Sequence, residues 1–318
     1  MFNSTTAKTL FKNSEKFRDP LLTADGKERA VVGLTRLRTI WFNTGSLCNI
    51  TCKNCYMGSS PTNDALIYLK LSHVIKYLED ISEQELPVEE IAFTGGEPFM
   101  NKEFTEMMNE SLSRGFRVLV LTNAMKPLQH HQEQLRSLKD RYGDALALRV
   151  SVDHYTLEGH EKIRGAGTWA QMMEGLQWLS INGFNLNVAG RICFGEPEAE
   201  ARLGYGEFFR RESINIDEED RSRLVLFPEM DVDIDVPEIT VGCWDILGIR
   251  PETIMCASSR MIVHKKGAKN PVIVPCTLLP YDAAFELGNE LSKSASNVRL
   301  NHPHCAKFCV LGGASCSP

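Results

Sequence analysis

The sequence has no apolar run long enough to cross a membrane as a helix, and it has no excess of positive charge. A membrane-spanning helix needs roughly 18 or more apolar residues, whereas the best run here, 272–279, is interrupted by Pro275. The formal net charge of −6 gives the chain no general attraction for nucleic acid or for anionic membrane surfaces. We therefore expect neither a membrane protein nor a nucleic-acid-binding protein.

The N-terminal segment lacks the apolar stretch of a secretion signal, and Glu15 argues against an organellar presequence. We therefore expect a cytoplasmic protein. Its 318 residues are 43% hydrophobic and 24% charged, which is ordinary for a folded globular chain. Disorder, collagen-like repeats and coiled coils are poor descriptions of such a composition.

Cysteine, in contrast, is plentiful, with ten residues in the chain. Three lie close together, one is isolated at Cys193, and six follow near the C-terminal end: Cys243, Cys256, Cys276, Cys305, Cys309 and Cys316. Without a secretion signal, metal or redox chemistry explains them better than disulfides do. The distribution predicts two separate cysteine sites.

From residue 38 to 228, β-rich apolar runs alternate with segments of helical period. This pattern predicts an α/β fold, a partial (β/α)6 TIM-like barrel between an N-terminal extension (1–37) and a cysteine-rich tail (229–318). The expected strands are 39–44, 90–94, 117–122, 147–152, 185–192 and 223–227. The expected helices are 65–81, 102–114, 129–142, 168–182 and 198–211. The acidic stretch 229–238 is interpreted as a solvated linker, with a metal site as the alternative.

The first motif is Cys48-Asn-Ile-Thr-Cys52-Lys-Asn-Cys55, directly after the first expected strand. Three thiolates on one short loop can wrap one face of a cubane cluster. Structural zinc sites and ordinary ferredoxin clusters take four protein ligands, so three ligands leave one metal position open. Zinc with a distant fourth ligand is the alternative.

The second motif is Ile91-Ala-Phe-Thr-Gly95-Gly96-Glu97-Pro98, a buried strand that runs into a two-glycine turn. Glycines leave the backbone accessible, so its carbonyls and amides can bind an amino-acid-like ligand. A plain tight turn is the alternative.

The order and position of these motifs resemble those of the radical S-adenosylmethionine (radical SAM) superfamily. Members carry CxxxCxxC after the first strand and GGEP after the second. The resemblance continues through Leu121-Thr-Asn-Ala124, Val150-Ser-Val-Asp-His154, His160 and Arg164-Gly165, and covers residues 38–228. Ala124 and His154 depart from it, because the family usually has Gly at both positions.

The resemblance implies that Cys48, Cys52 and Cys55 hold a 4Fe-4S cluster whose open iron binds S-adenosylmethionine. The implied contacts to that cofactor are Gly95, Gly96 and Glu97 at the methionine ammonium, Asn123 and Ser151 at the ribose or carboxylate, Arg164 at the carboxylate, and Tyr56 at the adenine. For Arg164, a helix-capping or ion-pair role is the alternative.

Two further residues are candidate catalytic groups. His154 is a candidate polar or proton-transfer group, or else a satisfied structural histidine. Cys193 is a candidate donor of a hydrogen atom or thiolate, or else an inert buried cysteine. Arg191, two residues before Cys193, is a candidate for binding an anionic group.

The tail resembles a shortened twitch or SPASM domain, which implies an auxiliary 4Fe-4S cluster. The expected ligands are Cys256, Cys276, Cys309 and either Cys305 or Cys316, with Cys243 the least secure member of the group. A structural zinc is the alternative, and it could involve His302 or His304.

The predicted function is therefore a radical SAM enzyme of oxidoreductase type. It would cleave S-adenosylmethionine reductively and abstract hydrogen from an unidentified substrate, with electrons from a donor such as flavodoxin or ferredoxin. A metabolite is slightly favoured, since only about 37 residues precede the first strand; a peptide-modifying maturase is the alternative. A noncatalytic iron-sulfur or zinc protein is the competing class.

Overall fold

The computed structural model describes residues 15–230 and 235–315. Its centre is an eight-stranded sheet of order β7-β6-β5-β4-β3-β2-β8-β9, in which all pairs except β8 with β9 are parallel. The strands are β2 (Thr39–Asn43), β3 (Glu90–Thr94), β4 (Arg117–Thr122), β5 (Leu146–Ser151), β6 (Asn185–Ile192), β7 (Leu224–Pro228), β8 (Ser259–Val263) and β9 (Val272–Val274). The expected α/β class with a mainly parallel sheet is confirmed.

All six strands expected from the sequence are present, as β2 to β7, with ends within one residue of the prediction. The expected six strands of residues 38–228 are confirmed, and β8 and β9 of the tail extend the sheet beyond β2. These two strands form the hairpin that surrounds Gly267. The predicted tail begins where β7 ends, at Pro228.

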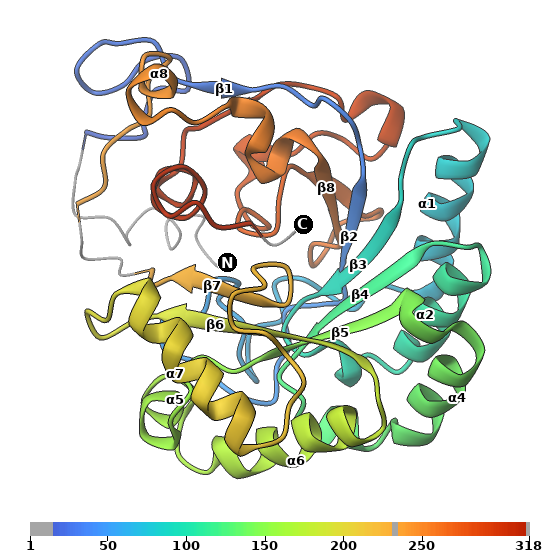
Figure 1. Ribbon diagram of the computed structural model, residues 1–318. Coiled ribbons are helices and arrows are strands. Elements are labelled where there is room, and N and C mark those ends of the chain that lie inside the picture. The colour runs from blue at the N-terminus through green and yellow to red at the C-terminus, as the bar shows by residue number, and fades with distance from the viewer. Residues whose placement is uncertain (1–14, 231–234, 316–318) are drawn as a thin grey trace.

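The helices lie along the outside of the sheet (Figure 1). They are α1 (Leu71–Glu83), α2 (Phe104–Ser113), α3 (Lys126–Gln129), α4 (Gln132–Tyr142), α5 (Leu157–Arg164), α6 (Thr168–Ile181), α7 (Glu198–Arg211) and, in the tail, α8 (Cys243–Leu247). A π-helix, η8, covers Cys305–Leu311, and short 3-10 turns occupy Pro98–Met100, Gly143–Ala145, Pro251–Thr253, Met255–Ala257, Ala283–Phe285 and Leu291–Lys293.

Three helix predictions need correction. The expected helix 65–81 starts only at Leu71, because the segment before it bridges to the tail, with Leu66 opposite Lys265. The expected helix 129–142 begins only at Gln132, as α4, and the separate short helix α3 ends at Gln129. Helix α5 was not expected; Thr156 caps it by accepting a hydrogen bond from the Gly159 N–H.

The two faces of the sheet pack against different parts of the chain, because successive side chains of a strand point to opposite faces. Ile40 and Phe42 of β2 belong to the core under the helices, where Phe42 stacks on Phe93 with ring centroids 5.6 Å apart. Trp41, which lies between them, belongs to the second core together with Phe308 of the tail. The tail therefore covers the face of the sheet that the helices leave open.

The tail also closes on the N-terminal segment and on the far edge of the sheet. β1 (Val31–Val32) pairs with β10 (Val298–Arg299), and η8 packs against β7 through Phe308 and Phe227, with ring centroids 5.1 Å apart. Glu238, at the end of the acidic stretch, pairs with buried Arg29 of the N-terminal segment at 2.6 Å. The part of that stretch at 231–234, with Asp231 and Asp233, lies outside the described residues. Among the described helices, none is long and apolar enough to cross a membrane.

Candidate active site

The loop that carries Cys48, Cys52 and Cys55 follows β2, at the carboxyl edge of the parallel strands. Cys48 is buried and the other two are half-buried, and the three sulfurs are close enough to influence one another electrostatically. Burial raises the pKa of the Cys48 thiol to about 12 and also raises that of Cys52. The three predicted ligands of the first motif thus lie on one loop, within range of one another's charge, although their sulfurs are not arranged around a single metal ion.

The two-glycine turn after β3 packs directly on this loop. The Gly96 N–H donates to the Gly45 carbonyl at 2.8 Å, and the Glu97 N–H donates to the Leu47 carbonyl at 3.1 Å. A β-carbon on Gly96 would lie 2.0 Å from the Leu47 oxygen and 2.9 Å from the Cys48 nitrogen. Glycine is required here because one main chain touches another.

The Glu97 side chain is buried and ties the β3 turn to the loop after β4. Its carboxylate accepts hydrogen bonds from the Thr122 hydroxyl at 2.9 Å, the Asn123 N–H at 2.8 Å and the Phe99 N–H at 3.2 Å. Burial nevertheless raises the pKa of Glu97 to about 7. Through these bonds Glu97 links two loops, and its contact with a ligand stays a prediction.

Asn123 extends this link to the cysteine loop. Its side-chain amide donates to the Asn49 side-chain oxygen at 2.8 Å, next to Cys48, and its own oxygen accepts from the Met125 N–H at 3.0 Å. The loops after β2, β3 and β4 are therefore bonded into one unit around Cys48.

A buried charge cluster lies beside Cys52. Arg164 at the end of α5 makes two hydrogen bonds to Asp153, at 2.9 and 3.2 Å, and Arg191 of β6 approaches the same carboxylate at 3.3 Å. These cations hold the pKa of Asp153 at about 2, and their charges favour the thiolate form of Cys52. The alternative of an ion-pair role for Arg164 agrees with this geometry.

Asp153 is the member of this cluster that sequence analysis left without a role. The signal was present in the sequence, since an acidic residue directly after an apolar strand must find a partner if it is buried. Which cations would reach it was not predictable, because they come from α5 and β6.

The two candidate catalytic residues follow neighbouring strands, His154 after β5 and Cys193 directly after β6. His154 Nδ1 lies 2.9 Å from the Thr156 hydroxyl, its ring stacks on Tyr155, and its Nε2 lies 3.8 Å from a Glu196 oxygen. These contacts fit the structural alternative for His154. Cys193 is buried, and burial raises the pKa of its thiol to about 12, so the thiol form predominates.

Tyr56 and Ser151 complete the predicted set. The Tyr56 hydroxyl donates to the Pro228 carbonyl at 2.8 Å, and its ring packs edge-on against Phe308 of the tail at 5.5 Å. Ser151, the last residue of β5, is half-buried at the same edge of the sheet. The predicted residues of the barrel thus follow, or end, strands of one sheet edge, except Arg164, which ends helix α5.

In the tail, Cys256, Cys276 and Cys305 are buried close to one another, and burial together with the other two thiols raises the pKa of Cys305. Cys309 is half-buried on the same π-helix as Cys305. Cys243 is separate and accepts a hydrogen bond from the Thr240 N–H at 3.3 Å. Cys316 lies outside the described residues.

The rings of His302 and His304 lie 4.5 Å apart, next to Cys305 in the chain, and His304 Nδ1 lies 3.3 Å from the Leu278 carbonyl. Burial lowers the pKa of His302 to about 3, which keeps its imidazole neutral. Across 15–230 and 235–315, no three His, Cys, Asp or Glu side chains lie close enough to share one metal ion.

The residues of the first site fit a thiolate-bound iron-sulfur cluster. Thiolates are the ligands that such clusters take in proteins. The two buried guanidinium groups exceed the single Asp153 carboxylate by one positive charge, and that charge acts on Cys52. A surplus cation next to thiolates stabilises an anionic group bound there.

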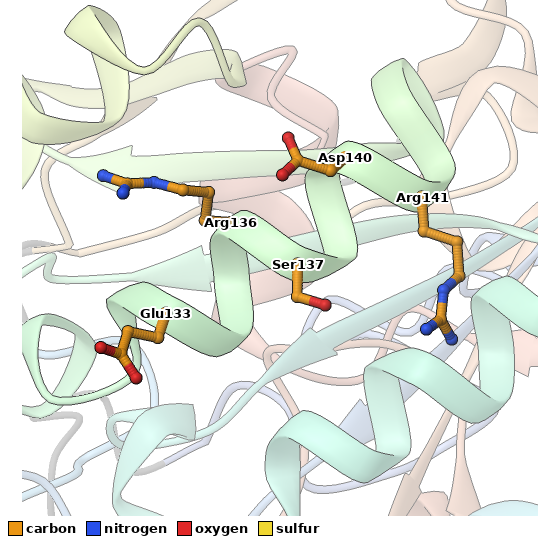
Figure 2. A pocket seen from close by; sticks show the side chains of 5 residues that line it. All are labelled: Glu133, Arg136, Ser137, Asp140 and Arg141. Carbon is orange, nitrogen blue, oxygen red and sulfur yellow. The ribbon is translucent and has the colours of Figure 1, made fainter.

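A shallow hollow also runs along the exposed side of α4, away from the strand ends. Figure 2 shows its lining residues Glu133, Arg136, Ser137, Asp140 and Arg141, whose charged side chains point in different directions. Mixed charges on one exposed helix give this hollow no chemistry of its own.

Comparisons with known proteins agree with the strand order and the motifs. A family model described as the radical SAM superfamily matches residues 42–203, just over half of the chain. The antilisterial bacteriocin subtilosin biosynthesis protein AlbA of Bacillus subtilis (strain 168) is 29% identical over 143 residues, which are 45% of this chain and 30% of AlbA. The AdoMet-dependent heme synthase of Nitratidesulfovibrio vulgaris is 23% identical over 175 residues, 52% of this chain and 43% of that enzyme.

Among solved structures, Streptococcus suis SuiB bound to its precursor peptide SuiA superimposes with a TM-score of 0.58 and 9% identity, over 83% of this chain and 64% of SuiB. At that identity the likeness shows the fold alone, and it confirms the expected partial barrel. The chain matches less than half of the length of AlbA and of the heme synthase.

Proposed function

Since the chain belongs to the radical SAM superfamily, we propose that it is an enzyme in which Cys48, Cys52 and Cys55 would hold a 4Fe-4S cluster. The open iron of that cluster would bind S-adenosylmethionine. The observation that carries the proposal is the packing of the two-glycine turn on the cysteine loop, where Gly96 meets Leu47. When bound, the cluster and its cofactor supply one-electron cleavage of the sulfonium and an adenosyl radical that abstracts hydrogen.

The chain's own residues position and shield this chemistry. Gly95 and Gly96 offer main-chain groups to the methionine ammonium, and Ser151 and Asn123 offer polar side chains to the ribose or carboxylate. Arg164 offers the carboxylate a guanidinium that it shares with Asp153. Tyr56 supplies an aromatic face for the adenine. Glu97 acts by holding the two loops together rather than by direct contact.

His154 and Cys193 remain candidate groups on the substrate side. The raised pKa of Cys193 favours donation of a hydrogen atom over action as a thiolate. The structural contacts of His154 with Thr156 make it the weaker candidate of the two.

We propose that residues 229–318 form the tail and bind a second 4Fe-4S cluster. The supporting observation is that Cys256, Cys276 and Cys305 are buried close together, with Cys309 on the same π-helix. Cys305 is thereby favoured as a ligand, and Cys316 is the alternative. An electron donor such as flavodoxin or ferredoxin would reduce the first cluster.

For the substrate we propose a peptide. SuiB was solved with a precursor peptide, and AlbA acts in bacteriocin biosynthesis by its name. These relatives reverse the slight preference for a metabolite that the N-terminal segment suggested. The similarity to a heme synthase keeps a small molecule as the second candidate.

The test is anaerobic reconstitution with iron and sulfide, followed by dithionite and S-adenosylmethionine. We expect about eight irons per chain, as for two 4Fe-4S clusters, and formation of 5′-deoxyadenosine. Cys52→Ala should abolish this product. Cys243→Ala is the matched control, because Cys243 lies apart at Thr240, and it should retain the product.

Stoichiometric zinc without any response to S-adenosylmethionine would instead support a noncatalytic structural protein. The substrate is tested separately, by adding to the active enzyme a peptide encoded by a neighbouring gene. A change in the peptide's mass supports the peptide proposal, whereas turnover of a tetrapyrrole alone supports the small-molecule candidate.

A further inference from the structure

We propose that Arg191 is a positioning residue that clamps the main chain between Cys52 and Cys55 and places a positive charge beside these cysteines. The inference deepens the proposed function, because its electrostatic part rests on a cluster bound by the cysteines. Its mechanical part concerns the polypeptide alone and can be tested without metal.

The clamp consists of two hydrogen bonds from one nitrogen. Arg191 Nη1 donates to the Lys53 carbonyl and to the Asn54 carbonyl, both at 3.1 Å. These are the only two residues between the second and third cysteines in the sequence. Fixing both carbonyls therefore fixes the directions in which the side chains of Cys52 and Cys55 project from the backbone.

The clamped segment needs such support. Asn54 has a φ of +52°, in the left-handed region that non-glycine residues rarely adopt. Asn tolerates this conformation better than most residues, but the conformation persists only when neighbouring groups impose it. A third bond, from the Lys53 N–H to the Ile163 carbonyl at 2.7 Å, holds the preceding peptide unit, between Cys52 and Lys53.

Arg191 is itself held firmly enough to act as a support. It is 4% exposed, its Nε lies 3.3 Å from the Asp153 carboxylate, and its guanidinium lies 4.7 Å from the centre of the Tyr56 ring. The Tyr56 hydroxyl is anchored in turn to the Pro228 carbonyl at the end of β7. The Arg191 side chain, which is held rigidly on β6, thus fixes the position of the cysteine loop relative to the sheet.

The charge of Arg191 has a second consequence. Arg164 and Arg191 share the Asp153 carboxylate, so one positive charge is left beside Cys52. Reduction adds a negative charge to a cluster, and a nearby cation favours the reduced form. Arg191 should therefore raise the reduction potential of the first cluster.

The experiment compares Arg191→Gln, which removes the charge and the nitrogen that makes both hydrogen bonds of the clamp, with Arg191→Lys, which keeps the charge on a single donor group. Arg202→Gln is the matched control, because Arg202 is also a buried arginine that donates to main-chain carbonyls, at Glu218 (2.6 Å) and Leu224 (3.5 Å), away from the cysteines.

In the apoprotein, trypsin cleavage after exposed Lys53 reports on the clamp. We expect Arg191→Gln to be cleaved there at least about ten-fold faster than wild type, because the loss of even one of the two hydrogen bonds from this charged group has that effect. Arg191→Lys should fall between them, and Arg202→Gln should match wild type. In the reconstituted protein, Arg191→Gln should have a more negative midpoint potential, while Arg191→Lys stays close to wild type.

Equal cleavage after Lys53 in Arg191→Gln and Arg202→Gln overturns the clamp, and an unchanged midpoint potential overturns the charge effect. If Arg191→Gln does not fold, Arg191→Lys decides the clamp by the same cleavage assay, and full wild-type protection there counts against it. Wild-type protein that takes up no iron refutes the proposed function, whereas the cleavage result still decides the clamp.

Discussion

Replacement of Gly96 by alanine tests whether the turn after β3 and the Cys48 loop must touch main chain to main chain. The added β-carbon would lie 2.0 Å from the Leu47 oxygen, 2.4 Å from the Leu47 carbon and 2.9 Å from the Cys48 nitrogen. Atoms in van der Waals contact lie roughly 3.5 Å apart, so one of the two loops must retreat by about 1.5 Å. Neither side can relieve the contact by rotating a side chain.

The size of the effect follows from what such a retreat breaks. The hydrogen bonds from Gly96 to Gly45 and from Glu97 to Leu47 both cross this contact. Overpacking in a well-packed region costs about 1–3 kcal/mol, and the upper end applies where only main chain can move. For a domain of this size, about 3 kcal/mol lowers the melting temperature by roughly 6 °C.

The assay is thermal unfolding of the apoprotein together with iron content after reconstitution. Gly242→Ala is the control, because a β-carbon there meets only the Thr240 hydroxyl at 3.9 Å, and the residue has a φ of −70°. We expect Gly242→Ala to match wild type, and Gly96→Ala to melt earlier and lose iron. If Gly96→Ala keeps both the melting temperature and the iron content of Gly242→Ala, the contact does not constrain the loop and the reasoning is refuted.

Three further predictions concern the buried supports of the site. Burial raises the folded pKa of Glu97 to about 7, so the contribution of its protonated form to apoprotein stability is fully present below the unfolded pKa of 4.5 and is lost as pH rises through 7. The free energy of unfolding should therefore fall by about 3 kcal/mol between pH 4.5 and pH 8 on account of this group. Glu97→Gln should remove that difference in denaturant unfolding at the two pH values. Asp153→Asn leaves two buried guanidinium groups without a counter-charge, and should lower the free energy of unfolding by about 3–5 kcal/mol, whereas an effect below that of Arg202→Gln would contradict the charge cluster. Tyr281→Phe removes the 2.7 Å hydrogen bond to the Met57 carbonyl and should cost about 1 kcal/mol, with faster loss of iron to a chelator; unchanged iron retention would show that the tail does not support the cysteine loop.

The strands of the barrel could be predicted from the sequence because each is a short apolar run that ends at a recognisable turn. Ile91 to Thr94, for example, is buried on both faces and stops at Gly95, so neither its type nor its end is ambiguous. The sequence did not show, however, that β8, which carries Arg260, joins the sheet beside β2. That arginine is fully buried, and its guanidinium donates to the carbonyl of nearby Cys256 and to that of Ser294, which lies much further along the chain.

The cysteines and the two-glycine turn were predictable as a site because strand ends of a parallel sheet meet at one edge. The roles within the site were less so. Glu97 was expected at a ligand, but its three donors come from Phe99 and from the loop after β4. Arg191 was expected to bind an anionic group; it lies beside the Asp153 carboxylate, and its Nη1 donates to two main-chain carbonyls. Spacing identifies which residue types are available, whereas tertiary contact decides which atoms they use.

The cysteine loop is supported by residues from four neighbouring strands or the loops that follow them. This explains why so many polar side chains are buried around it. Gly96 after β3 packs on Leu47, Asn123 after β4 bonds to Asn49, and Arg191 of β6 bonds to Lys53 and Asn54, with its guanidinium oriented by Asp153 after β5. Each support depends on the register of its strand, because a shift of one residue turns a side chain to the opposite face of the sheet. The apolar core that sets this register lies on other residues, such as Phe42 and Phe93. Substitutions at the supports should therefore weaken metal retention more than they weaken the sheet.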